Sequence, residues 1–216
     1  MKKIFLASWM VCVSLLTFAQ ADSTKGFEGK ITMSIEYEEV PEEYEPYVSM
    51  LPKEITTYVK GKKSCMEQNS MGGGSTTVMD GETGKGFTLI NMMGQISAYE
   101  MNPSNETKTE AKPTITYIDE SKEIAGYKCK KAEMKFEGEE EVLVVWYTEE
   151  LPEGYNPQIK GIKGFPMEYN VEKKDMILLI TVKTVSKETV SDSRFELPEG
   201  LELKPYSEML KLGIGG

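Results

Sequence analysis

The chain has 216 residues, and its 25 Lys and Arg against 35 Asp and Glu give a formal net charge of −10 at pH 7. Such an acidic surface repels polyanions, which excludes nucleic acid and anionic lipid headgroups as partners. Histidine is absent, and this excludes Ser-His-Asp and Cys-His catalysis as well as histidine-based zinc sites.

The N-terminus has the pattern of a secretory signal peptide. Lys2 and Lys3 precede an apolar run over 4–18, and the small alanines of Ala19-Gln20-Ala21 are typical of a signal-peptide cleavage site. We therefore expect residues 1–21 to be removed, with Cys12 among them, and an uncleaved anchor is the alternative. The expected location is the periplasm, the cell exterior or the outer membrane.

Residues 22–216 are long enough for a single domain. Without Lys2 and Lys3, the chain keeps 23 basic against 35 acidic residues, a net charge of −12. No later stretch is apolar enough to span a membrane, so we expect no transmembrane segment in the mature chain.

The first mature segment alternates strictly between apolar and polar residues. In "FEGKITMSIEYE", Ile31, Met33 and Ile35 share one face, while Lys30 and Thr32 point the other way. Period-two alternation predicts a strand with one dry face. Its length of about 12 residues, roughly 40 Å, is typical of a large curved sheet.

Hairpin signals follow a short helical stretch. Helical spacing between Pro46 and Leu51 predicts one short helix over 46–51, which Pro52 ends. Glycine-rich breaks at Gly61, 72–74, 80–86 and Gly94 then separate short β-runs, a pattern typical of antiparallel hairpins. The polar segment 102–113 is expected to be a surface loop.

The second half continues in the same way. The run 142–147 is apolar on both faces, which predicts a central strand covered on both sides. The segment 165–182 reads as a hairpin that turns at 173–175, and Pro205 starts a short terminal helix. The expected fold is mainly β (β-dominated α+β): a single strongly curved antiparallel sheet or half-open barrel of about 11 strands, with one or two short helices.

No motif in the chain carries a recognisable catalytic or metal-binding pattern. The stretch "DGETGKGFT" lacks the first glycine and the Ser or Thr of a phosphate loop. The glutamate runs lack calcium-loop spacing and are explained as solvated charge. Twelve methionines follow residue 21; apart from Met92-Met93 they lack the clustered spacing of copper carriers, so core packing or an adaptable lipid-binding lining is expected. We therefore expect that the protein is not an enzyme and that it has neither a metal site nor a cofactor.

Several short segments resemble an exported bacterial family. "IAGYKCKKA", "VWYTEEL" and "GIKGFPMEY" occur in the order seen in the GLPGLI-type proteins of unknown function, and "FEGKITMSIEY" and "RFELPEGLEL" resemble the family's ends. Gly-Phe-Pro-Met replaces the naming motif, which favours the broader relatives. The resemblance implies a fold similar to the lipoprotein carriers LolA and LolB, a half-open barrel closed by helices around an apolar cavity. It implies no catalytic residue.

Two functions remain open from the sequence. The first is binding of an apolar ligand, such as a lipid or a lipoprotein acyl chain, in the concave face of the sheet. The second is a non-catalytic structural or protein-interaction module of the cell envelope whose concave face is filled by side chains; its protein partner is unknown. The candidate ligand-lining residues are Met33, Trp146, Phe165, Met167 and Tyr169.

Cys65 and Cys129 are the two cysteines that follow the signal segment. In an oxidising compartment an even pair predicts a disulfide, and two free thiols are the alternative. Met66 is expected to face inward, which places Cys65 on the outer face of its strand. The alternation slips by one residue near Lys130 and Lys131, and this slip predicts a β-bulge that aims Cys129 at its partner.

Overall fold

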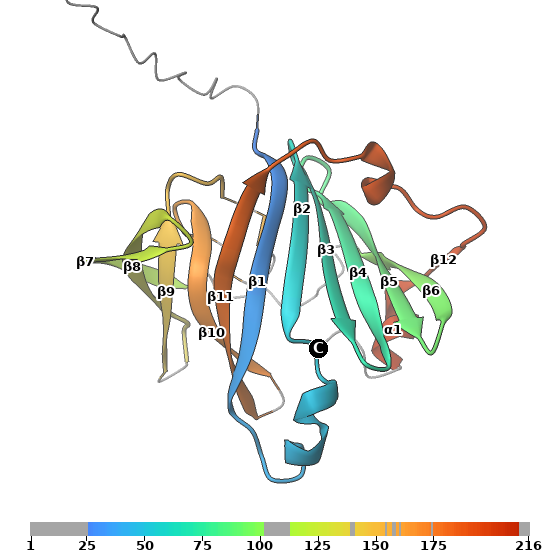
Figure 1. Cartoon of the computed structure of the whole chain (residues 1–216), viewed down its shortest axis with the longest axis horizontal. Coiled ribbons are helices and arrows are strands. Elements are labelled where there is room, and N and C mark those ends of the chain that lie inside the picture. Colours follow the sequence, from blue (N-terminus) through green and yellow to red (C-terminus); the bar gives the residue numbers. More distant parts are fainter. Residues whose placement is uncertain are drawn as a thin grey trace, which may run out of the picture.

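A single open, strongly curved sheet of 12 strands dominates the part of the chain that the structure describes (Figure 1). The computed structural model describes residues 26–101, 113–138, 141–153, 155–156, 159, 161–173 and 175–211. The predicted signal segment 1–21 and nearly all of the predicted loop 102–113 lie outside these residues. The mainly β fold with one curved sheet is confirmed, with one strand more than the expected 11.

The helices are short. The first, η1 (Glu45–Met50), begins close to the predicted position and has Pro46 at its start. A second 3-10 turn, η3 (Asp192–Phe195), and the helix α1 (Tyr206–Lys211) follow the last long strand. The strands are β1 (Glu28–Glu39), β2 (Glu54–Lys60), β3 (Lys63–Ser70), β4 (Gly73–Asp80), β5 (Lys85–Met92), β6 (Gln95–Met101), β7 (Thr114–Ile124), β8 (Tyr127–Lys135), β9 (Val142–Thr148), β10 (Phe165–Lys173), β11 (Met176–Lys187) and β12 (Leu203–Lys204).

Two runs of hairpins build the sheet, in the order β12-β6-β5-β4-β3-β2-β1-β11-β10-β9-β8-β7. The pairing of β1 with β11 joins the two runs at the centre (Figure 1). Every pair is antiparallel except that of β12 with β6, which is parallel. The predicted hairpin turns explain the order, because strands joined by tight turns pair with each other.

The main core lies on the inner face of the sheet. The alternation predicted for β1 is present, with Ile31, Met33 and Ile35 all buried. Strands β8 to β11 contribute the same alternation, and Leu151, Ile159 and Ile162 of the segment that leads into β10 cover this face. The inner face is therefore filled by side chains from the sheet and from this segment.

The chain after β11 wraps around the edge of the sheet. Val190 and Phe195 pack on the outer face over Cys65, Val78 and Phe87. Strand β12 then pairs along the edge strand β6, and Met209 of α1 packs against Ile90 and Tyr99. One continuous segment thus covers the outer face of β3 to β5 and the free edge of β6, which protects both from water.

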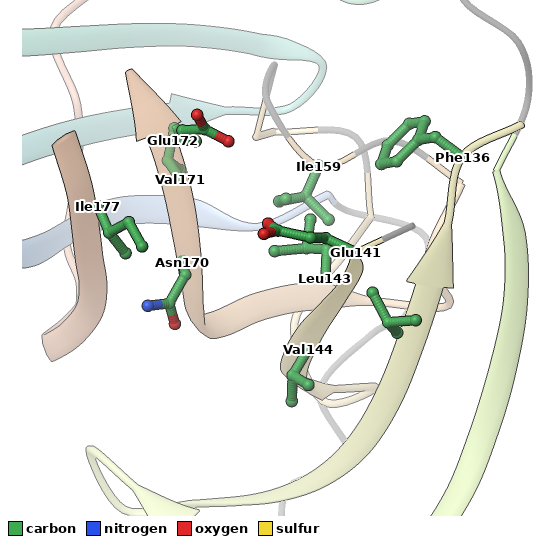
Figure 2. A pocket seen from close by; sticks show the side chains of 10 residues that line it. Phe136, Glu141, Leu143, Val144, Ile159, Asn170, Val171, Glu172 and Ile177 are labelled. Atoms are coloured by element: carbon green, nitrogen blue, oxygen red, sulfur yellow. The ribbon is translucent and has the colours of Figure 1, made fainter. Parts of the chain in front are cut away.

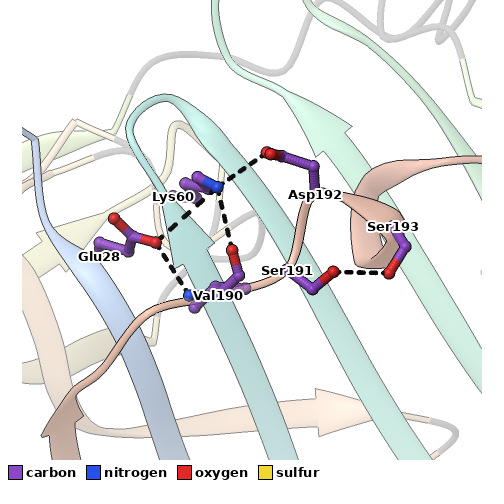
Figure 3. A network of polar contacts seen from close by, with 6 residues as sticks. All are labelled: Glu28, Lys60, Val190, Ser191, Asp192 and Ser193. Carbon is purple, nitrogen blue, oxygen red and sulfur yellow. Dashed lines mark hydrogen bonds and ion pairs between the residues drawn. The ribbon is translucent and has the colours of Figure 1, made fainter.

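A small polar network fixes the start of this segment (Figure 3). The Lys60 ammonium group donates to the Val190 carbonyl oxygen at 3.0 Å and pairs with Asp192 at 2.9 Å. The Glu28 carboxylate accepts the Val190 N–H at 2.9 Å. Neighbouring carboxylates raise the pKa of Lys60, so the ammonium group stays charged.

Candidate functional site

Four of the five predicted ligand-lining residues lie in the packed core. Met33, Phe165, Met167 and Tyr169 are each no more than 2 % exposed and belong to the inner-face cluster. None of them lines the cavity described below. The structure brings these four together, but as core side chains, in the way that long apolar residues pack in a dense interior.

Trp146 differs from these four in being only half-buried, although it packs against the same cluster. Its neighbours Val145 and Tyr147 point into the core. The Lys122 ammonium group lies 4.4 Å from the centre of its indole ring and pairs with Glu168. A cation over an aromatic face stabilises the ring where it lies. The five residues therefore belong to, or pack against, one core cluster.

Tyr169 is the most buried polar side chain of this group. The Asn156 side-chain amide donates a hydrogen bond of 2.7 Å to its phenol oxygen, and the side-chain oxygen Oδ1 of Asn156 accepts the Ile159 N–H at 3.1 Å. Burial raises the pKa of Tyr169 to about 12, so the phenol stays neutral. These bonds hold Asn156 against Tyr169 of β10 and Ile159 against Asn156.

The predicted disulfide is wrong, since Cys65 and Cys129 are both free and buried. Cys65 is on the outer face of β3, as its alternation with Met66 predicted, but Cys129 of β8 packs into the inner core. Five strands separate β3 from β8 in the sheet. Sulfur atoms on opposite faces of separate strands cannot meet without rebuilding the backbone.

The β8 alternation does slip where it was predicted, because Cys129 and Ala132 are both buried. The ladder between β7 and β8 is irregular at this level, but the extra residues, Asp119 and Glu120, are on β7. The slip turns Cys129 into the core, where its thiol donates to the Tyr127 carbonyl oxygen at 3.4 Å. Burial raises the pKa of both thiols to about 11, so neither is a ready nucleophile.

An open cleft of about 450 Å³ lies between β9 and β10 (Figure 2). This volume is within the range of about 300–1,000 Å³ that is typical of ligand pockets. The lining is mostly apolar, with two carboxylates and one amide. The lining residues are Phe136, Glu141, Val142, Leu143, Val144, Ile159, Asn170, Val171, Glu172 and Ile177.

The cleft exists because the ladder between β9 and β10 stops early. Pairing runs from Phe165 with Thr148 to Tyr169 with Val145, and ends there. Beyond that point β9 still pairs with β8, and β10 still pairs with β11 as far as Lys173. Within the described residues, 142–144 and 170–173 therefore have a strand partner on one side only.

Each of the two strand ends presents side chains to both faces of the sheet. On the inner side, Leu143, Val171 and Ile159 border the cleft beside the core. On the outer side, Val142 and Val144 are 43 % and 36 % exposed, which contradicts the cover predicted for both faces of this strand. These two valines place exposed apolar side chains beside the strand ends that pair on one side only.

Polar groups line the rim of the cleft. Figure 2 shows the Glu141 carboxylate near Ile159, and the Glu172 carboxylate at the end of β10. Asn170 donates a side-chain hydrogen bond of 2.8 Å to the Glu38 carboxylate, which holds the amide on the outer side. Two carboxylates at the rim give the cleft a negative potential that favours a cationic ligand.

Only weak signals for this cleft are present in the sequence. The run 142–147 is apolar at consecutive positions, and three glutamates, 139–141, precede it. That pattern also fits a fully covered strand, and only the pairing shows that the start of β9 has lost one neighbour.

The described residues hold no group of three or more His, Cys, Asp or Glu side chains that could bind a metal ion. In the same part of the chain, every helix is too short or too polar to cross a membrane.

No family model and no curated protein sequence matches this chain. Among solved structures it is similar to PNGF-II in its C2 and P21 crystal forms, with TM-scores of 0.54 and 0.56 at 14 % identity. The match covers 86 % and 87 % of this chain but 33 % of the PNGF-II chain. The chain thus spans about a third of the length of PNGF-II, and the likeness shows the fold alone.

Two other solved structures overlap less well. MucB in complex with MucA(peri) has a TM-score of 0.35 at 6 % identity, over 80 % of this chain and 55 % of the other. LprF from Mycobacterium bovis also has a TM-score of 0.35, at 11 % identity, over 78 % of this chain and 90 % of the other. Overlaps of this size carry no argument about fold or ligand. The comparisons therefore support a curved β-sheet fold, and the GLPGLI-type resemblance remains one of short motifs.

Proposed function

We propose that the protein is an exported, non-catalytic interaction module that binds an extended polypeptide segment in the cleft between β9 and β10. The early end of the β9–β10 ladder at Tyr169 and Val145, where the cleft opens, carries this proposal. Export rests on the N-terminal pattern, and the absence of catalysis rests on the absence of histidine and of a nucleophile motif.

The backbone supplies the affinity in this account. The strand ends 142–144 and 170–173 face the cleft with main-chain groups that lack a strand partner among the described residues. Main-chain N–H and C=O groups need hydrogen-bond partners, and an added strand provides them in register. An acyl chain has no such groups, so the polypeptide is favoured over a lipid, which was one of the two alternatives left open by the sequence.

The side chains supply the selectivity. Successive residues of an added strand point to opposite faces of the sheet. Residues on the inner side would meet Leu143, Val171 and Ile159, which select apolar side chains. Residues near the rim would meet Glu141 and Glu172, which select lysine or arginine. The proposed ligand is therefore a segment in which apolar and basic residues alternate.

A titration with two labelled peptides tests the proposal. One peptide alternates valine with lysine, the other alternates valine with glutamate, and fluorescence anisotropy reports binding. We expect the protein to bind the lysine peptide and to reject the glutamate peptide. In the double variant Glu141→Lys/Glu172→Lys, the protein should instead prefer the glutamate peptide. An exposed ion pair is worth up to about 1 kcal/mol, so each substitution should change the ratio of the two affinities by about fivefold.

The variant Glu199→Lys/Glu202→Lys is a matched control, because it makes the same charge change at exposed positions outside the cleft. The control should keep the original preference. If the two double variants change the preference equally, the net charge of the protein alone explains the binding, and the proposal is overturned. If a fluorescent fatty acid binds in the cleft and neither peptide binds, the proposed polypeptide ligand is wrong and the ligand is an acyl chain.

A further inference from the structure

Four exposed methionines lie in or beside three neighbouring segments: η1, the β3–β4 turn and the β5–β6 turn. Met50 ends η1, Met71 lies in the β3–β4 turn, and Met92 and Met93 lie at the β5–β6 turn. Their exposed fractions are 44 %, 75 %, 57 % and 95 %, respectively. Methionine is normally a core residue, so four exposed methionines from three loops need an explanation.

Main-chain hydrogen bonds hold these loops together. The Met71 N–H donates to the Met50 carbonyl oxygen at 3.4 Å, and the Met93 N–H donates to the Gly72 carbonyl oxygen at 3.1 Å. The Asn91 side chain braces the last turn by accepting the Gly94 N–H at 2.9 Å. The backbone of the methionine tip, defined as Met50, Met71, Met92 and Met93, is therefore fixed even though the side chains are free to turn.

Met93 occupies a backbone conformation that methionine disfavours. Its φ of +51° and the φ of +86° at Gly94 are those of a type I′ turn. Asn or Asp is the usual residue at the first of these positions, and another residue costs about 1–2 kcal/mol there. A residue that is strained and 95 % exposed contributes little to the fold. Such costs are typical of functional positions.

We propose that the methionine tip binds a soft monovalent cation, Cu(I), through thioether sulfurs contributed by Met71, Met93 and either Met50 or Met92. Thioethers favour Cu(I) over hard cations. Each methionine has three rotatable bonds, so sulfurs on loops joined by main-chain hydrogen bonds can turn towards one ion. Binding moves no electrons and displaces no proton, because a thioether carries none.

Competing soft ligands are scarce at the surface. The chain has no histidine, and Cys65 and Cys129 are both buried. This site shares no residue with the cleft, so it stands or falls independently of the proposed peptide binding. The sequence alone showed only the adjacent pair Met92-Met93; the hairpins bring Met50 and Met71 to it.

The test uses Ag(I), a redox-inert analogue, added as silver nitrate to the full chain in chloride-free buffer. Methionine is labelled with ¹³C at its methyl group, so that each thioether gives its own NMR signal. We expect the signals of Met71 and Met93 to shift with a stoichiometry of one ion per chain. The affinity should be the same at pH 5 and pH 7, since thioethers hold no proton, whereas thiol binding would strengthen as the pH rises.

Met93→Asn is the decisive variant, because asparagine suits the type I′ turn and should keep or raise the melting temperature. Its Ag(I) affinity should fall by roughly tenfold or more, which exceeds the small effect of losing one unrelated thioether. Leu210→Met adds an exposed methionine on α1, outside the methionine tip, and should add no binding. Unshifted Met71 and Met93 signals, or unchanged affinity in Met93→Asn, would overturn the proposal.

Discussion

Tyr169 of β10 and Val145 of β9 form the last paired position between their strands, and the cleft opens at the next residue of each. On one side of this pair the inner face is solid core, with Met167 and Val145 fully buried. On the other side the two strands separate and Val144 reaches the surface. The same two strands therefore supply both the packed interior and the proposed binding site.

Core methionines should affect stability but not peptide binding. Met33→Ala and Met167→Ala each remove a fully buried side chain, so each should lower the free energy of unfolding by about 2–5 kcal/mol. Urea unfolding measures this loss, and anisotropy at low urea should give an unchanged peptide affinity. Met50→Ala, at an exposed position, is the control and should change stability by less than about 0.5 kcal/mol. If the two core variants lose little stability but bind the ligand more weakly, the ligand binds on the concave face instead of in the cleft.

The two thiols should react with iodoacetamide only after the surrounding core opens. Both are buried and free, and the raised pKa values keep them protonated at neutral pH. In denaturant without reductant, peptide mapping should find a carbamidomethyl group on Cys65 and on Cys129. A disulfide-linked pair of peptides in the same map would contradict the structure.

Lys60→Met should expose Cys65 selectively. Lys60 holds Val190 and Asp192 (Figure 3). The same segment packs over Cys65 on the outer face. Without the ammonium group, the segment should open more often and alkylation of Cys65 should accelerate, while Cys129 keeps its rate. Lys62→Met removes an exposed ion pair with Glu82 next to this position and should leave both rates unchanged. Equal acceleration at both cysteines would indicate global unfolding instead.

Stability should decline at alkaline pH. Burial raises the pKa of Cys65 and Cys129 from 9.0 to about 11, and that of Tyr169 from 10.0 to about 12. The unfolded chain therefore loses these protons at lower pH than the folded chain does. The stabilisation is complete below about pH 9 and falls as the pH rises towards 11 and then 12. Urea midpoints at about pH 8, 10 and 11 measure the decline, and Cys65→Ala/Cys129→Ala should flatten it between 9 and 11.

Much of the fold was predictable because it follows from local alternation. Strand β1, the helix η1 and the turn at Gly61 each have a signal within a few neighbouring residues. The inward direction of Met66 also followed from its strand pattern, as the structure confirms. Such features depend on side-chain period and turn chemistry, which the sequence contains.

The site was not predictable, because it depends on which strands are neighbours. The same alternation that placed Cys65 on the outer face could not show that Cys129 faces the inner core, on a strand separated from β3 by five others. The methionine and aromatic residues chosen as a ligand lining have the composition of a core, and in the structure they form one. The run 142–147 is apolar, but whether both its faces are covered depends on the end of the β10 ladder.

Amide hydrogen exchange, measured residue by residue with and without the lysine–valine peptide, tests strand addition most directly. We expect slower exchange for the amides in 142–144 and 170–173 that face the cleft, because an added strand accepts their hydrogen bonds. The amides of 63–70 in β3, distant in the sheet, should keep their rates. Peptide binding that leaves the exchange of 142–144 and 170–173 unchanged would contradict strand addition in the cleft.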